Sequence, residues 1–312
     1  MTTAVLRTAD AWWVQTARGA AKIATSARST KELLADRAAI DAAARSGDTV
    51  AVDDLELVSP VTAPCRVVAQ MTNFASHVKD AGMDPKSVPL TFFRKSSASI
   101  SGPYAEIVKP AHVRLLDYEV EIGLVIGRDI AVGTSISDSN LADYICGLAV
   151  TNDISARDIQ LPQTQFYEAK SYPTFTPTGP ALVLLDADEL KRFGELRLRL
   201  RVNGEERQNA LVDGDMLYRP LQALQSLTRF QDLAAGDLIL TGTPVGTALS
   251  APPKPIEIIA SLLPPAVKWK AFFKSQARNP KYLHDGDVIE ASVRTDDGAI
   301  DLGTQRMTVE YA

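Results

Sequence analysis

The stretch that decides the fold is Leu115–Ile130, LLDYEVEIGLVIGRDI, an apolar and β-prone run that carries Glu119 and Glu121 two residues apart. Alternate side chains of a strand point to the same face, so the two carboxylates lie side by side. If that face meets solvent, the pair is an ordinary polar stripe on a one-sided sheet. If it faces a cavity, both groups stay charged only beside a cation, because like charge and desolvation favour protonation. This stretch alone leaves both alternatives open.

The chain on both sides of this run is rich in short strands. After Pro64 many β-prone segments are separated by Gly, Pro, Asn and Asp, with few helices between them. This texture is typical of a mixed β-roll or barrel. Asn203-Gly204 indicates a hairpin turn. Helices are expected over residues 137–145, SDSNLADYI, and 218–230, YRPLQALQSLTRF. We therefore predict a mixed α+β protein that is mainly β.

The N-terminal part has a different pattern. Short strands surround a turn at Gly19, and a helix-forming segment follows, STKELLADRAAIDAAARSGD, in which Ser29 and Glu32 form a capping box. Prolines then end an extended segment. These signals predict a small N-terminal α+β unit over residues 1–62 and a larger domain over 63–312.

The larger domain contains a proline-flanked excursion over residues 252–283. Its centre is amphipathic and carries Trp269, Phe272 and Phe273. A long insertion of this kind serves as a lid over a site, as a dimer contact, or only as a packed loop.

The composition is that of an ordinary soluble protein, and the cysteine usage leads us to expect a cytoplasmic location. Lys and Arg number 33 against 38 Asp and Glu, a net charge of −5, and no basic block occurs, so we expect neither nucleic acid nor membrane as a partner. The N-terminus lacks the pattern of a signal peptide, and no apolar run approaches the ~20 residues of a membrane helix. Cys65 and Cys146 are too few for a disulfide framework. The expected partner is a small molecule.

A second unusual stretch is Thr151–Gln160, TNDISARDIQ, which follows the apolar ICGLAV. Polar groups that leave a buried strand need partners. Asp153 could join the two glutamates as a third oxygen ligand, a set that suits Mg²⁺ or Mn²⁺. The alternative is a turn that Asp and Asn side chains cap and in which Arg157 makes a salt bridge.

Two segments further along carry groups that stabilise negative charge. Lys170 stands just before a bend rich in Pro and Thr, and Thr241, Gly242 and Thr243 form a tight turn after a strand. A lysine near a divalent ion can stabilise an enolate, and the N–H groups of a turn can bind a carboxylate.

One of the three histidines has a carboxylate at a helical spacing. His77 and Asp80 are three residues apart, so on a short helix they share a face. A histidine that a carboxylate orients can act as a general base on water. His112 and His284 lack this spacing and are expected at the surface.

In this order, several motifs resemble those of the fumarylacetoacetate hydrolase family. They are NFASH, DYEVEIGLVIG, NDISARDIQ, AKSY, GPALV, GDLILTGTPVGT and LHDGDVIEASV. The resemblance covers Pro64 to the C-terminus, apart from the excursion. It implies that family's mixed β-roll or barrel fold, a homodimer, and a Mg²⁺ or Mn²⁺ ion.

The resemblance also implies three groups of site residues. The metal ligands are Glu119, Glu121 and Asp153. The catalytic residues are His77, Asp80, Lys170, Gln160 and Arg157. The substrate-binding residues are Gly242, Thr243 and Asn73. In this scheme His77 and Asp80 activate water while Lys170 and its neighbours stabilise oxyanions.

The function that the resemblance implies is hydrolysis of a carbon–carbon bond in an acylpyruvate or related β-diketo acid of aromatic catabolism. Oxo-acid decarboxylases, tautomerases and dienoate isomerases or hydratases of the family remain alternatives, because all stabilise the same enolate. A catalytically silent member is a third possibility. It is suggested by two departures from the family pattern, Met71 in place of Gly and Asp80 in place of Glu.

Overall fold

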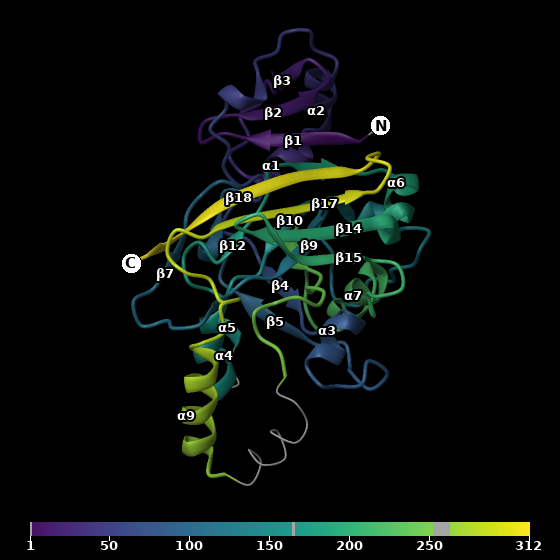
Figure 1. Cartoon of the computed structure of the whole chain (residues 1–312). Helices are drawn as coiled ribbons and strands as arrows, with labels where there is room; N and C mark the ends of the chain where they lie inside the picture. Colours follow the sequence, from purple (N-terminus) through teal and green to yellow (C-terminus); the bar gives the residue numbers. More distant parts are fainter. Residues whose placement is uncertain (1, 164–165, 252–262) are drawn as a thin grey trace.

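The computed structural model describes residues 2–163, 166–251 and 263–312 (Figure 1). Its larger sheet has nine strands in the order β3-β2-β1-β13-β10-β9-β16-β4-β5. In chain order these are β1 (Thr3–Arg7), β2 (Trp12–Thr16), β3 (Gly19–Lys22), β4 (Val67–Gln70), β5 (Phe92–Lys95), β9 (Val120–Ile126), β10 (Ile145–Asn152), β13 (Leu182–Leu184) and β16 (Leu238–Leu240).

A smaller sheet of five strands packs against the larger one. Its order is β15-β14-β17-β18-β7. The strands are β7 (Ile107–Lys109), β14 (Leu196–Val202), β15 (Glu205–Leu211), β17 (Val288–Thr295) and β18 (Asp301–Tyr311). Two short pairs complete the described strands, namely β8 (Leu116–Asp117) with β11 (Ser155–Ala156), and β6 (Ile100–Ser101) with β12 (Thr176–Pro177).

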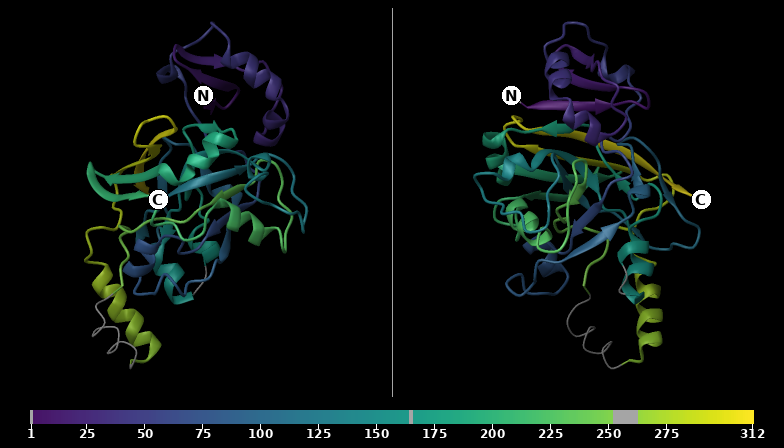
Figure 2. Two further views of the ribbon diagram at one scale, coloured as in Figure 1. Left: turned by 90° about the vertical axis from the view of Figure 1, so that its right-hand side faces the viewer. Right: turned by 180° about the vertical axis from the view of Figure 1, so that it is seen from behind.

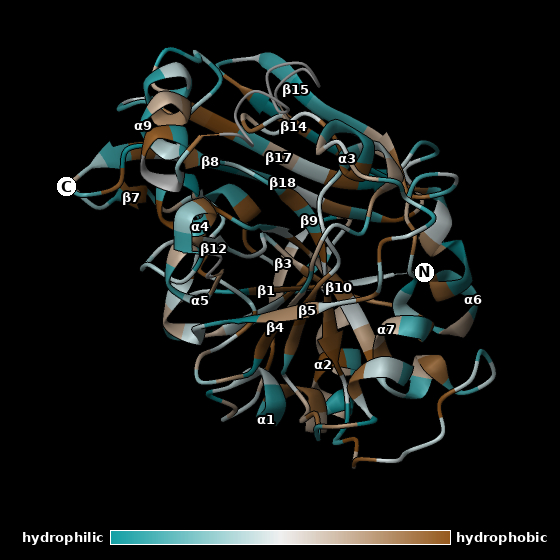
Figure 3. Ribbon diagram, turned by 90° about the horizontal axis from the view of Figure 1, so that it is seen from below, coloured by the Kyte–Doolittle hydropathy of each residue, from teal (hydrophilic) through white to brown (hydrophobic). Residues whose placement is uncertain are grey.

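Burial along the strands explains which sheet is central. All seven residues of β9 are buried, as are all but one of β10, and both strands contact strands of the smaller sheet. In β14 and β17, buried residues alternate with more exposed ones, as expected for strands with one face outside. Figure 3 shows apolar residues on the inner strands β4 and β10. The opening stretch is therefore part of the core.

Short helices surround the sheets. The α-helices are α1 (Thr30–Ala35), α2 (Arg37–Ala44), α3 (Ala75–Asp80), α4 (Arg157–Gln163), α5 (Phe166–Ala169), α6 (Ala187–Lys191), α7 (Pro220–Leu227) and α9 (Pro265–Gln276). The 3₁₀ helices are η1 (Val52–Asp54), η2 (Ser97–Ser99), η3 (Leu141–Asp143) and η4 (Arg192–Glu195). Among the described residues, no helix combines the length and the apolar composition that crossing a bilayer requires.

The predicted fold class, mixed α+β and mainly β, is confirmed. In the described strands both sheets keep two free edges, so the structure is an open roll and not a closed barrel. The hairpin turn is also confirmed, because Asn203 and Gly204 both have positive φ, 52° and 80°. α7 lies within the helix expected over 218–230, whereas only η3 forms within 137–145.

The N-terminal unit departs from the single helix that the sequence predicts. The capping interaction is present, with Ser29 Oγ accepting from the Glu32 N–H at 3.2 Å, but the helix ends at Ala35. Asp36 has a non-helical ψ of 56°, and its side chain caps α2 by accepting from the Ala39 N–H. An internal Asp thus splits the helix in two.

The N-terminal strands do not form a sheet of their own. β1 pairs antiparallel with β13, so β1 to β3 extend the larger sheet at one edge (Figures 1 and 2). The boundary at residue 62 stays a prediction. In the excursion, residues 252–262 lie outside the described part of the chain. α9 follows them and projects from the body on the side where α4 and α5 lie (Figures 1 and 2).

Candidate functional site

The three predicted metal ligands come together where β9 and β10 lie side by side. Glu121 is within β9 and pairs with Thr151 of β10. Glu119 precedes β9 and Asp153 follows β10, and the Asp153 N–H donates to the Glu119 carbonyl at 2.8 Å. One ligand atom from each carboxylate lies within 4.8 Å of the others. All three side chains are buried, so the glutamate pair faces a cavity and not solvent.

Three buried cations hold two of these carboxylates. Lys170 Nζ donates to Glu119 Oε2 at 2.6 Å and to Asp153 Oδ2 at 2.5 Å. Lys95 Nζ donates to Asp153 Oδ1, and Arg157 Nη2 donates to Glu119 Oε1. Each contact is a charge-assisted hydrogen bond, the strong class in a low-dielectric interior. Glu119 and Asp153 are therefore compensated without any added ion.

Glu121 is different, because it makes no ion pair with any described residue. Its Oε2 accepts one hydrogen bond, from the Gly242 N–H at 2.6 Å. Burial raises the pKa of Glu121 well above 4.5, and the charges of Asp153 and Glu119 raise it further. Burial also acts to raise the pKa of Glu119, but there the charges of Arg157 and Lys170 outweigh it and lower the pKa to about 2. A carboxylate kept unpaired beside two others fits a divalent cation.

The turn after β16 explains why glycine stands at position 242. Gly242 has φ of 85°, and a Cβ there would lie 2.8 Å from Cβ of Asn73, so any other residue is strained. Thr241 fixes the turn to β9, since its N–H and hydroxyl both donate to the Ile122 carbonyl. The N–H of Gly242, which we expected to bind a substrate carboxylate, instead donates to Glu121.

Arg157 is anchored by a residue that the sequence analysis did not single out. Its Nε donates to Asp117 Oδ2 at 2.8 Å, and its Nη1 donates to Gln160 Oε1 at 2.8 Å. Asp117 is fully buried and also accepts from the Ala248 and Leu249 N–H groups. Asp117 precedes Glu119 by two residues, so in a strand the two side chains point to the same face. This spacing is the sequence signal that could have identified Asp117 as a site residue. Asp117 and Gln160 together orient the guanidinium of Arg157 toward Glu119.

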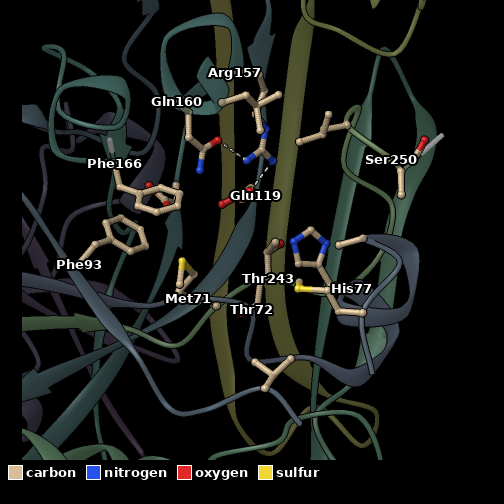
Figure 4. Close-up of a pocket in the computed structure, with 18 of the residues that line it drawn as sticks. Met71, Thr72, His77, Phe93, Glu119, Arg157, Gln160, Phe166, Thr243 and Ser250 are labelled. Atoms are coloured by element: carbon tan, nitrogen blue, oxygen red, sulfur yellow. Dashed lines mark hydrogen bonds and ion pairs between the residues drawn. The ribbon is translucent and has the colours of Figure 1, made fainter. Parts of the chain in front are cut away.

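His77 lines the same cavity without the partner that we predicted. Figure 4 shows Glu119 between His77 on one side and Phe93 and Phe166 on the other. His77 Nδ1 is buried and has no hydrogen-bond partner in the described residues. Asp80, the last residue of α3, does not line the cavity and makes no described hydrogen bond to the ring. Burial lowers the pKa of His77, so the imidazole is neutral at neutral pH.

The site opens into one cavity of about 1100 Å³. Nine of the predicted site residues line it, namely His77, Glu119, Glu121, Asp153, Arg157, Gln160, Lys170, Gly242 and Thr243. Asp80 and Asn73 are not among the lining residues. The Asn73 amide instead donates to the carbonyls of Tyr218 and Thr241 at 2.9 and 2.8 Å, so it joins two backbone segments behind the site.

Lys95 is the other functional residue that sequence reasoning missed. It is 2% exposed, contacts Asp153, and also donates to the Phe175 carbonyl at 2.8 Å. Strand alternation puts Lys95 on the same face as Phe93, which lines the cavity. That signal was too weak by itself, because a lysine at a strand end is usually solvated.

Residues 66–310 match the family model for the fumarylacetoacetate (FAA) hydrolase C-terminal region. Oxaloacetate tautomerase Fahd2a, mitochondrial, of Rattus norvegicus is 34% identical over 197 residues, which are 63% of this chain and 61% of the rat protein. Oxaloacetate tautomerase YisK of Bacillus subtilis is 34% identical over 210 residues, 65% of this chain and 67% of that protein. The match thus spans less than two thirds of the rat relative.

Solved structures are similar over the whole chain. The crystal structure of a probable 2-hydroxyhepta-2,4-diene-1,7-dioate isomerase from Mycobacterium abscessus is 31% identical with a TM-score of 0.75, covering 100% of this chain and 99% of that one. A fumarylacetoacetate hydrolase from Exiguobacterium antarcticum is 26% identical with a TM-score of 0.72 and full coverage of both chains.

Proposed function

This chain belongs to the fumarylacetoacetate hydrolase family, and from that premise we propose that it is a divalent-metal-dependent enzyme that interconverts the keto and enol forms of a 2-oxo acid. The observation that carries the proposal is the buried carboxylate cluster, in which Glu121 alone has no cationic partner among the described residues. The relatives named oxaloacetate tautomerases, and the structural neighbour named a dienoate isomerase, support this reaction class over the hydrolysis that we first expected.

Glu119, Glu121 and Asp153 would hold the ion, Mg²⁺ or Mn²⁺. Bound there, the ion would act as a Lewis acid that polarises the keto group of the substrate. The chain prepares this site in advance, because Lys95, Lys170 and the backbone N–H of Gly242 already orient the carboxylate oxygens.

Lys170 is placed to stabilise the charge that develops on the substrate oxygen. Burial lowers the pKa of this lysine, but the charges of Asp153 and Glu119 outweigh burial and raise the pKa, so the ammonium stays charged. Its Nζ lies at the wall of the cavity beside both carboxylates. A fixed positive charge that is buried, as Lys170 is, stabilises an enolate more than it would in solvent.

His77 is the group suited to move the proton. Its imidazole is neutral, the residue lines the cavity, and its buried Nδ1 has no described hydrogen-bond partner. A neutral imidazole nitrogen can accept the proton from the carbon next to the keto group, and the enolate oxygen then gains a proton from the imidazolium or from solvent to give the enol. In the reverse direction the oxygen loses its proton and the imidazolium returns one to carbon. Nothing but a proton changes place, so the reaction needs no attacking water.

Hydrolysis of an acylpyruvate is the second candidate function. The observation that favours it is again His77, a buried base at the cavity wall. Activation of water by histidine is helped by a carboxylate that orients the ring, and Asp80 does not supply one in the described residues. This difference is why we place tautomerisation first.

The test follows the keto–enol equilibrium of oxaloacetate by ultraviolet absorbance, with and without Mg²⁺, beside a chromatographic assay for acylpyruvate cleavage. We expect metal-dependent tautomerisation without cleavage. Cleavage at a comparable rate would favour the hydrolase. Isothermal titration with Mg²⁺ and oxalate addresses the silent alternative, which would gain support from an absence of binding. A homodimer, a cytoplasmic location and the lack of nucleic-acid or membrane partners stay predictions.

A further inference from the structure

The cavity is much larger than a small oxo acid requires. Its volume of about 1100 Å³ exceeds the range of about 300–1,000 Å³ that is typical of pockets for drug-sized ligands. The charged cluster occupies only its inner end. The rest of the cavity therefore has room for a large group on the substrate.

An aromatic wall begins directly beside the reacting end. The rings of Phe93 and Phe166 lie 5.3 Å apart, centre to centre, and both line the cavity. Lys170 Nζ is 5.2 Å from the centre of the Phe93 ring. Figure 4 shows Met71 next to this pair. A substrate group that leaves the cluster on this side meets two aromatic rings and a thioether.

Helix α9 continues the apolar wall at the outer end. Trp269 and Phe272, three residues apart on one face, line the cavity, and their rings lie 5.7 Å apart, edge to face. Phe273 is on the neighbouring face, where it packs against the core and under the guanidinium of Arg114. The helix is thus anchored by Phe273 while Trp269 and Phe272 are turned toward the cavity.

The described residues that line the cavity include no buried, unpaired cation for a second carboxylate. Among the described lining residues, Arg157 and Lys170 are charged and buried, but both are already paired with buried carboxylates. Lys268 is exposed on α9, and Asp84 at the outer end is negative. An unpaired carboxylate buried against the aromatic wall would lose its hydration without compensation.

We propose that the substrate is a 2-oxo acid whose group remote from the metal-binding end is apolar and at least as large as a phenyl ring, and not a second carboxylate. This inference rests on the proposed function for the identity of the reacting end. It differs from the substrates in the names of the tautomerase and isomerase relatives, which carry carboxylates at both ends.

The first test compares two substrates that differ only in that group. In phenylpyruvate a phenyl ring takes the place of the second carboxylate of oxaloacetate. With Mg²⁺ we expect kcat/KM for tautomerisation to favour phenylpyruvate by about 10-fold or more, the scale of discrimination by an apolar pocket. A preference for oxaloacetate would overturn the inference and leave the proposed function intact.

Variants of α9 locate the effect. The double variant Trp269→Ala, Phe272→Ala should lose about 10-fold in kcat/KM for phenylpyruvate and less than about 2-fold for oxaloacetate. Lys270→Ala removes a long side chain from the same helix at an exposed position outside the lining, and should change neither value. An equal loss on both substrates in the double variant would count against the inference.

If no turnover is found, the proposed function fails. A binding measurement then still tests the inference. Isothermal titration with Mg²⁺ compares 2-oxo-4-phenylbutanoate with 2-oxoglutarate, which carry a phenyl ring and a carboxylate on the same carbon. We expect the phenyl compound to bind the wild-type chain at least about 10-fold more tightly. Equal or reversed affinities would overturn the inference.

Discussion

At the inner end of the cavity, Glu119, Glu121 and Asp153 are at most 5% exposed and lie on or directly beside the two central strands of the larger sheet, β9 and β10. At the outer end, Trp269 and Phe272 are partly exposed on α9, a helix that projects from the body (Figure 1). The inner end is held by paired charges and the outer end by contacts between rings. The carboxylates therefore depend on the core, whereas the two rings that we propose select the substrate can change with little effect on the fold.

The substitution with the largest expected effect at the inner end of the cavity is Glu121→Gln. Loss of one charged ligand should lower Mg²⁺ affinity by at least about 100-fold, beyond the effect of outer-shell changes, and reduce tautomerisation to background. Titration calorimetry and the absorbance assay measure the two effects. Glu56→Gln, at an exposed position, is the matched control. Full activity of Glu121→Gln at limiting Mg²⁺ would mean that the inner end is not a metal site.

Lys95→Met asks whether paired charges hold the inner end together. Removal of one member of a buried ion pair costs about 3–5 kcal/mol, and we expect that loss in the free energy of unfolding without metal. Mg²⁺ should restore part of it, because the ion supplies positive charge beside Asp153. Urea denaturation of this variant, and of Lys86→Met at an exposed site, gives the comparison. A loss below about 1 kcal/mol would contradict the role of Lys95.

His77→Ala tests the proton-transfer role at the side of the cavity opposite Phe93. We expect kcat to fall by about 100-fold, or about 2.7 kcal/mol, with Mg²⁺ affinity unchanged. Asp80→Ala should change kcat by less than about 2-fold, since Asp80 makes no described hydrogen bond to His77. Equal losses in the two variants would indicate that the dyad forms during turnover.

The smallest effect is the pH dependence that His77 adds to stability. Burial lowers its folded-state pKa below 6.5. As the pH falls below 6.5, the unfolded chain binds a proton that the folded chain does not, so stability drops. His77→Gln should remove this contribution. The free energy of unfolding of this variant, relative to that of the wild type, should therefore rise as the pH falls from about 7.5 to about 5.5. Urea denaturation at both values measures it, and a constant difference would contradict the lowered pKa.

Local patterns in the chain were sufficient for part of the site. The two-residue spacing puts Glu119 and Glu121 on one face, and the polar residues after ICGLAV pointed to Asp153 as their neighbour. The fold class and the Asn203-Gly204 hairpin also follow from short-range periodicity and turn chemistry. Such features depend on residues that are close in sequence, where strand and turn geometry leaves few choices.

The partners of these carboxylates could not be predicted in this way. Lys95 is 58 positions from Asp153 in the chain, and β5 is four strands from β10 in the sheet. Strands in a flat sheet are about 4.8 Å apart, so β5 would lie roughly 19 Å away, beyond the reach of a lysine. The contact exists because the sheet curls. The absence of a bond between His77 and Asp80 likewise depends on how α3 packs and not on their spacing.

By itself, the sequence determined the pattern of short strands, the family, and the carboxylates that could hold a metal, because motifs and alternation are local. Only the tertiary structure decided that the glutamate pair faces a cavity, that Glu121 alone of the three ligands has no described cationic partner, and that Trp269 and Phe272 face the same cavity. Each of these facts depends on segments far apart in the chain that meet only when the sheets pack and curl.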